Sequence, residues 1–219
     1  MQNKILYYKT DNNNPVKDFI NNLDIKTNAK ILKILHYMKN YGLESVSAYI
    51  KKLSGSPLWE IRILGKTNVR IIFALYEKGT IWVLHGFIKK TNKTPRIELK
   101  TAMERYTKCK NLIDRWYLKR YISFMKKIYG YPFEKHLKEQ LKKPEFKKAW
   151  DEIEIESSIA EGMIGKRIEK NISQRDLAKK INSTQAVISR IEGMNANPSI
   201  NTLKRIAKAL DAKLEIRIR

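Results

Sequence analysis

Five residues in the first half of the chain have side chains suited to chemistry on phosphate groups. Two are arginines on the polar sides of predicted strands, where they could converge on one face of a sheet; guanidinium groups bind phosphate bidentately and stabilise a pentacoordinate transition state. A histidine can exchange protons near neutral pH. Two lysines at a strand end could hold a polyanion or protonate a leaving oxygen. These candidate catalytic residues are Arg62, Arg70, His85, Lys89 and Lys90.

Each of these residues also has a purely structural interpretation. Arg62 could pair with Glu60 or Glu77 at the sheet edge, and His85 could be a packed histidine with a satisfied ring. The lysine pair could be the solvated end of a strand. No group of carboxylates and histidines stands at metal-ligand spacing, so we expect chemistry without a metal or another cofactor.

The composition favours a nucleic-acid partner. The 219 residues include 45 Lys and Arg against 22 Asp and Glu, a net charge of +23, and each phosphate neutralised by such a surface releases a counterion. An anionic membrane surface fits less well, and no apolar run approaches the roughly 20 residues that span a bilayer. The single Cys109 allows no disulfide within one chain. The N-terminus lacks a signal-peptide pattern, so we expect a cytoplasmic protein.

The first half of the chain reads as an α+β domain. Asn14 and Pro15 form a helix start, and Gly42 ends a second helix. Apolar residues then alternate with polar ones, which predicts an antiparallel meander packed against two helices. The predicted strands cover residues 4–9, 59–63, 69–76 and 81–88, and the predicted helices begin near residues 15, 26 and 96.

The second half is predicted to be helical. Residues 111–124 are basic and aromatic, and we interpret them as an extension of the helix that begins at Arg96, with Met125 after them as the natural start of a separate protein. Pro144 should start a new turn within residues 132–150. The remaining predicted helices cover residues 156–171, 173–181, 183–192 and 199–210, and a strand is expected at 213–219.

One pair of these helices has the pattern of a helix-turn-helix. Ser173 is a candidate N-cap, the small Ala178 allows two helices to cross closely, Asn182 suits a left-handed turn, and Ser183 is placed to cap the next helix. With the tail EGMNANPSINTLKRIAKAL, this stretch resembles the Cro/C1-type helix-turn-helix family of phage repressors over about fifty residues. The alternative is a helical bundle whose polar residues are only solvated.

The resemblance implies a DNA-binding role for the second helix, whose N-terminal residues would meet base edges in the major groove. Gln185 could pair bidentately with adenine, and Gln174 would contact backbone phosphate. Family members act as dimers, so we expect a homodimer through this domain, helped by the terminal strand. The implied DNA-binding residues are Gln174, Ser183, Thr184, Gln185, Ser189 and Arg190.

The first half carries a second resemblance. LWEIR, a strand beginning VRIIF, and LHGFIKKTNKTP before a helix are together similar to the HigB branch of the RelE superfamily of toxins, over about residues 1–108. The resemblance implies a ribosome-dependent messenger-RNA endonuclease that cleaves without a metal, through attack of the ribose 2′-hydroxyl. Many such toxins use a tyrosine near the C-terminus, and Tyr106 is only a loose positional match.

The segment YPFEKHLKEQLKKPEFKKAWDEIEIE before the helix-turn-helix resembles the HigA-like antitoxins that block HigB toxins. Its acidic run 151–156 could face the basic surface of the toxin; alternatively, the segment completes the core of the DNA-binding domain. The expected apolar contacts between toxin and antitoxin are Phe133, Leu137, Leu141, Phe146 and Trp150.

The sequence therefore predicts a toxin and its antitoxin in one polypeptide, joined by a lost stop codon or deliberately. The toxin would be inactive in the intact chain and released by proteolysis between about residues 111 and 131, while the antitoxin represses its own operon at operator DNA. The alternative is a transcriptional regulator whose RelE-like domain is catalytically inactive and binds a partner or RNA. The expected division is toxin 1–110, join 111–125, toxin-contacting helices 126–156 and DNA-binding domain 157–219.

Overall fold

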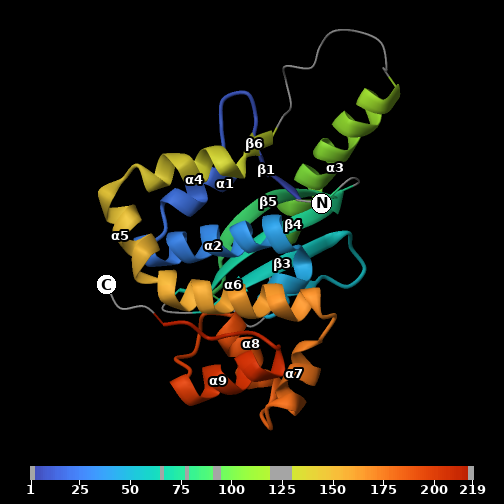
Figure 1. The fold of residues 1–219 in the computed structure, drawn as a ribbon. Helices are drawn as coiled ribbons and strands as arrows, with labels where there is room; N and C mark the ends of the chain where they lie inside the picture. Colours follow the sequence, from blue (N-terminus) through green and yellow to red (C-terminus); the bar gives the residue numbers. More distant parts are fainter. Residues whose placement is uncertain (1–2, 65–66, 77–78, 91–94, 119–129, 217–219) are drawn as a thin grey trace.

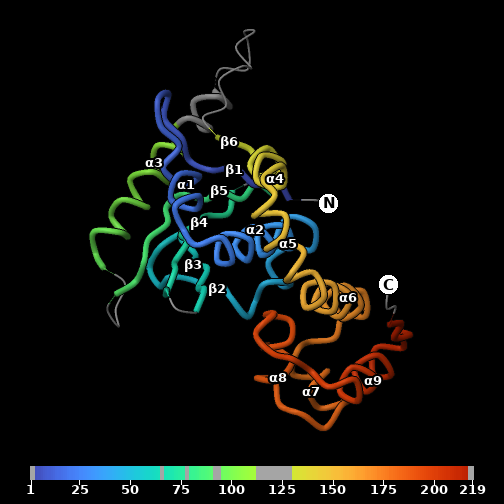
Figure 2. The backbone as a smooth tube through the Cα atoms, turned by 90° about the vertical axis from the view of Figure 1, so that its left-hand side faces the viewer, coloured from blue at the N-terminus to red at the C-terminus, as the bar shows by residue number. Residues whose placement is uncertain are grey.

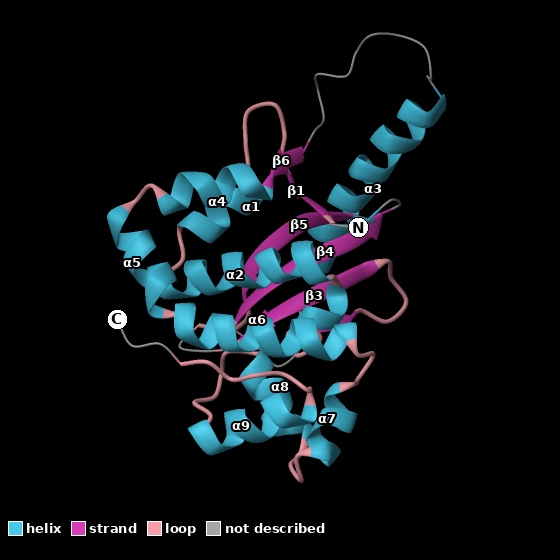
Figure 3. Ribbon diagram, viewed as in Figure 1, coloured by secondary structure: helices cyan, strands magenta, loops and turns pink. Residues whose placement is uncertain are grey.

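The computed structural model describes residues 3–64, 67–76, 79–90, 95–118 and 130–216. It shows an α+β N-terminal domain followed by a helical region (Figures 1 and 3). No helix in these ranges is long and apolar enough to cross a membrane.

The N-terminal domain is built on a six-stranded sheet with the strand order β2-β3-β4-β5-β1-β6. The sheet is mixed rather than antiparallel as expected, because β1 pairs parallel with β5. A parallel neighbour requires a long crossover connection, and α1 and α2 lie in the connection that follows β1. The strands are β1 Lys4–Tyr8, β2 Ile50–Lys52, β3 Leu58–Ile63, β4 Val69–Tyr76, β5 Thr80–Ile88 and β6 Gly130–Pro132.

Helices cover both faces of this sheet. A Cβ atom added at Gly86 would overlap the ring of Phe19 in α1 (Pro15–Asn21), whereas the neighbouring His85 contacts α3 (Arg96–Leu118) on the opposite face. Figure 2 shows α3 on one side of the strands and α2 (Ile25–Tyr41) on the other. Because both faces are covered, the first six residues of β4 are all buried, and the polar side expected for this strand is not exposed.

The core of the N-terminal domain extends into the second half of the chain. The strand β6 pairs with β1, and the following helices α4 (Phe133–Leu141) and α5 (Pro144–Glu152) pack on the side of α1 and α2. Pro144 starts α5 as predicted. Phe133, Phe146 and Ala149 belong to the same buried cluster as the strands. This segment therefore does not complete the core of the DNA-binding domain.

The helix-turn-helix has a separate small core, built on Leu177, Ile188 and Ile206. It comprises α7 (Gln174–Lys180), α8 (Gln185–Glu192) and α9 (Ile200–Ala209), and α6 (Glu154–Glu169) lies between this group and the N-terminal domain (Figure 1).

Several local predictions for this region can be checked. Ser173 caps α7 by accepting a hydrogen bond from the backbone of Asp176, and Asn182 has a φ of 46°, both as expected. The cap of α8 is Thr184 rather than Ser183. Residues 213–216 form no strand, and the rest of the expected terminal strand lies outside the described residues, as do Met125 and the end of the join. The helix α3 does extend through residue 118.

Candidate functional site

The two candidate arginines face each other across neighbouring strands, because Arg62 of β3 pairs with Arg70 of β4. Arg70 is buried, and its Nε lies 3.2 Å from Oε1 of Glu60, also buried. Burial lowers the pKa of Arg70, and the charge of Glu60 opposes this shift. The glutamate expected beside Arg62 therefore forms its ion pair with Arg70, while Arg62 is half-buried. Glu77 lies outside the described residues.

His85 lies on the same sheet face, opposite Ile72 and so two residues along β4 from Arg70. Its Nε2 is 2.5 Å from Oε2 of Glu98, and Nη1 of Arg105 lies 3.1 Å from its Nδ1. Since a guanidinium can only donate, Nδ1 accepts and Nε2 carries the proton. Burial lowers the pKa of His85, and the hydrogen bond to Glu98 opposes that shift. The ring is therefore held neutral, with both nitrogens engaged.

The two partners of His85 were not predicted from the sequence. Glu98 and Arg105 lie seven residues apart on α3, so they share one face of that helix. Arg105 also donates to the carbonyl of Leu84 and lies 5.1 Å from the ring centroid of Tyr8. Their spacing on the helix that follows the strand of His85 is the sequence signal that could have identified Glu98 and Arg105.

The remaining candidates of the first half lie apart from this network. Lys89 and Lys90 follow the last residue of β5; Lys89 is half-buried and donates its backbone N–H to Asn68, while Lys90 is exposed. Tyr106 is half-buried and packs against the core. The structure thus brings Arg62, Arg70 and His85 to one sheet face.

A second set of contacts joins the lysines of α1 and α2 to the acidic residues of α4, α5 and α6. Lys33 is almost fully buried: its Nζ lies 2.5 Å from Glu154 and 3.0 Å from Ser157, and 4.1 Å from the ring centroid of Trp150. The other ion pairs between these elements are Lys17–Glu139, Lys26–Glu152 and Lys39–Glu134.

The apolar contact residues named from the sequence lie at this junction. Phe133 and Phe146 are each 1% exposed within the N-terminal core, and three others are partly buried against it, namely Leu137, Leu141 and Trp150. Polar contacts that the sequence analysis missed add to them. His136 is fully buried, with Nε2 2.8 Å from Oδ1 of Asn21 and Nδ1 3.3 Å from the Tyr7 hydroxyl. Its burial lowers its pKa to about 4.

This junction and the arginine–histidine face lie on opposite sides of the sheet. Tyr7 of β1 contacts His136 of α4, whereas the next residue, Tyr8, contacts Arg105 of α3. Successive side chains of a strand point to opposite faces. The helices α4 and α5 therefore do not cover His85.

The candidate DNA-reading residues lie around the start of α8. Thr184, Gln185 and Arg190 are exposed, and Ser183 and Ser189 are half-buried. Gln174 differs from the expectation of a phosphate contact, because its Nε2 donates to Oε2 of Glu192 at 2.7 Å and its side chain is buried. Glu192 also accepts two hydrogen bonds from Arg167, at 2.7 and 3.2 Å. This buried network fixes α8 against α6 and α7.

Comparison with known proteins gives one match in each half of the chain. Residues 18–107 match the family model described as phage derived protein Gp49-like, and residues 166–216 match a helix-turn-helix model. The chain is 32% identical over 73 residues to proteins named antitoxin HigA1 from two strains of Mycobacterium tuberculosis, CDC 1551 / Oshkosh and ATCC 25618 / H37Rv. This alignment covers 33% of the chain and 49% of each relative, so the chain spans about half the length of the curated relatives it matches.

The chain therefore combines two recognisable domains. A Gp49-like domain, of the HigB/RelE-like toxin family, occupies the N-terminal half, and a DNA-binding helix-turn-helix domain similar to antitoxin HigA1 occupies the C-terminal half. Both resemblances drawn from the sequence are confirmed at this level.

Proposed function

We propose that this chain is a toxin and its antitoxin in one polypeptide: a ribosome-dependent messenger-RNA endonuclease held inactive by a DNA-binding antitoxin that represses its own operon. The observation that carries the proposal is the junction between the halves. Four lysines of α1 and α2 each meet a glutamate of the second half, over apolar side chains that complete one buried core.

In the proposed reaction, the ribose 2′-hydroxyl attacks the adjacent phosphorus and the 5′-oxygen leaves, so that a 2′,3′-cyclic phosphate remains. Arg62, the more accessible arginine, binds the phosphate and stabilises its added charge. His85 is held neutral, the form that can accept the hydroxyl proton, provided that Arg105 releases Nδ1. Lys89 or Lys90 gives a proton to the leaving oxygen.

The proposed inhibition acts through bulk rather than by covering these residues, since α4 and α5 lie on the far side of the sheet. With α4, α5 and α6 packed on it, the N-terminal domain would be too large to enter a confined site such as that on the ribosome. Cleavage of residues 119–129 alone would leave β6 paired with β1 and the ion pairs in place. Release thus requires removal of the helices, which revises the expectation that a cut in the join is enough.

Growth measurements test the nuclease. Residues 1–118, which retain all of α3, should arrest growth when expressed, and the full chain should not. Arg62→Ala in the short chain should restore growth, whereas Lys51→Ala, an exposed lysine on β2, should not. In the full chain, Lys33→Glu places a second carboxylate beside Glu154, and the repulsion should weaken the junction enough to slow growth.

One observation favours the alternative function, a transcriptional regulator whose RelE-like domain is catalytically inactive. Arg70 is paired with Glu60, and both nitrogens of His85 are engaged, as they would be in a domain that only binds. If the short chain and the Lys33→Glu chain both accumulate in folded form and leave growth unchanged, the nuclease proposal is wrong and the regulator stands.

Operator reading rests on Gln185 at the first position of α8. We expect Gln185→Ala to relax base preference at one operator position by about 1–3 kcal/mol. Exposed Lys204→Ala on α9 is the control, and it should weaken binding to all sequences alike. If Gln185→Ala leaves the base preference unchanged, Gln185 does not read bases.

We also propose that two copies of the chain pair through the helix-turn-helix domain, where Ile200 is 56% exposed.

A further inference from the structure

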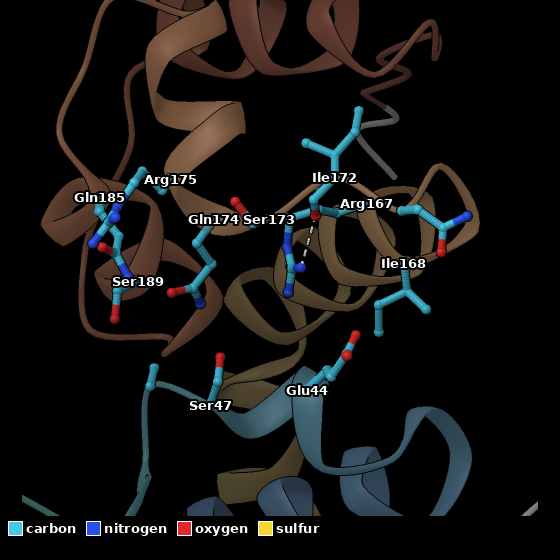
Figure 4. Close-up of a pocket in the computed structure, with 12 residues that line it drawn as sticks. Glu44, Ser47, Arg167, Ile168, Ile172, Ser173, Gln174, Arg175, Gln185 and Ser189 are labelled. Atoms are coloured by element: carbon cyan, nitrogen blue, oxygen red, sulfur yellow. Dashed lines mark hydrogen bonds between the residues drawn. The ribbon is translucent and has the colours of Figure 1, made fainter.

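The DNA-reading side of the helix-turn-helix is turned toward the N-terminal domain. A cleft of about 660 Å³ lies between the helix-turn-helix and the N-terminal domain. Its N-terminal wall includes Glu44 of the short helix η1 (Leu43–Val46) and Ser47, the residue that follows η1. Figure 4 shows Gln174, Gln185 and Ser189 on the opposite wall. Gln185 and Ser189, two of the side chains proposed to read bases, therefore line a cleft whose other wall is the N-terminal domain, while Gln185 keeps an exposed side chain.

The C-terminal end of α8 is fastened to the N-terminal domain. The hydroxyl of Tyr49, which is 3% exposed, donates to the carbonyl of Gly193, and Nζ of Lys30 donates to Oδ1 of Asn195. Between them, Met194 packs against the N-terminal core. These contacts hold the loop after α8 on α2 and on Tyr49, which lies between η1 and β2.

The first half of α6 is held to the same domain. Tyr37 of α2 donates to the carbonyl of Ser157 at 2.7 Å, and Tyr41 donates to Glu161 at 2.6 Å. The same helix also contributes to the helix-turn-helix core, because Met163 lies in that core and Ile159 packs against it. Gly162 lies between Glu161, which is bonded to the N-terminal domain, and Met163 of the helix-turn-helix core, and nothing lies within 4 Å of a Cβ added there. Since packing does not require a glycine here, this residue is suited to a bend.

A DNA duplex on α8 would meet the N-terminal domain in the docked arrangement. A reading helix lies inside the major groove, so the two phosphate backbones must pass along both of its flanks. One flank of α8 faces η1 across the cleft, and Glu44 places a carboxylate on that wall, where it would repel phosphate.

We propose that the N-terminal domain gates DNA binding: the docked chain excludes the operator, and the helix-turn-helix binds DNA only after it pivots about Gly162 and leaves η1. The inference rests on the proposed role of α8 in reading DNA. Docking and DNA binding then compete, so the apparent affinity for DNA is reduced by the fraction of chains that are undocked. Whatever loosens the contact at Tyr49 and Lys30 strengthens repression.

The first test measures DNA affinity with the full chain. The probe is a labelled duplex covering the promoter of the gene that encodes the chain, compared with a shuffled duplex of equal composition. Tyr49→Phe and Lys30→Ala each remove one docking hydrogen bond and should bind about two- to tenfold more tightly. The control is Lys26→Ala, which removes the same charge from α2 but only an exposed pair with Glu152.

The outcomes separate the two proposals. Affinities of Tyr49→Phe and Lys30→Ala no higher than that of Lys26→Ala would overturn the gate and leave operator binding in place. Failure of every chain to prefer the promoter duplex would remove the proposed DNA-binding role, and the gate with it.

The second test detects docking without DNA. In full chains carrying Gln185→Cys, a maleimide on a bulky polyethylene glycol chain should react more slowly than with Lys204→Cys, an exposed position outside the cleft. Adding Tyr49→Phe should accelerate the reaction at position 185 and leave that at position 204 unchanged. The native Cys109 is buried and adds little background. Equal rates at both positions, with or without Tyr49→Phe, would overturn the docked state.

Discussion

The two α3 partners of His85 act on its pKa in opposite directions. The Glu98 carboxylate favours the charged ring, and the Arg105 guanidinium disfavours it. We therefore expect Glu98→Gln to lower the pKa of His85 further and Arg105→Ala to raise it. An NMR titration of the imidazole protons measures both shifts, and His136 on the far side of the sheet is the internal control. If neither substitution moves the His85 titration, these residues do not form the network described above.

Residue types alone could not predict this network. Strand alternation predicted that Arg62 and Arg70 could converge on one sheet face, and the strand register agrees, but it did not place His85 on that face. It did not predict that Glu60 pairs with Arg70, nor that α3 supplies Glu98 and Arg105. Those contacts depend on the order of strands and on which helix covers which face, information that a local pattern does not contain.

At the scale of elements, α6 contacts two cores and contains two glycines, Gly162 and Gly165, of which Gly162 has open space beside it. Glycine destabilises a helix interior by about 0.5–1 kcal/mol relative to alanine, and the space around a Cβ at position 162 is open. Gly162→Ala should therefore raise the free energy of unfolding by about that amount, as measured in urea. Gly86→Ala is the opposite case, because its Cβ would overlap the ring of Phe19, and we expect a loss of about 1–3 kcal/mol. A destabilised Gly162→Ala chain would show that position 162 needs its glycine conformation.

Most elements could be predicted from periodicity and capping, and their arrangement could not. The helices α1, α2 and α5 begin at or within a residue of the predicted starts, because Asn14, Asp24 and Pro144 act locally. The short strands β2 and β6 were missed, since three residues carry almost no periodic signal. The parallel pairing of β1 with β5 joins residues about 76 positions apart, beyond the reach of any sequence window.

At the scale of the whole molecule, His136 makes the stability of the junction between the two halves depend on pH. It contacts Asn21 and Tyr7 from α4, while Lys17, Glu139 and Lys143 supply the nearby charges. Its pKa is about 4 in the folded chain against an ordinary value of 6.5, so the unfolded chain binds more protons between these values. The stability that it contributes is therefore complete above about pH 6.5 and is lost as the pH falls toward 4, by up to about 3 kcal/mol.

The neighbouring ion pair Lys17–Glu139 stays intact between pH 6.5 and 4. Hydrogen bonds from Lys17 and Tyr131 lower the pKa of Glu139 to about 2, so this carboxylate remains charged. We expect His136→Gln, whose side chain does not titrate, to lower stability at pH 7 but to flatten its decline between pH 6.5 and 4. Urea unfolding at several pH values measures this difference, with His85→Gln on the opposite face of the sheet as the matched variant outside the junction. A His136→Gln chain that declines as steeply as the parent would show that protonation of other groups, and not of this buried ring, destabilises the chain in acid.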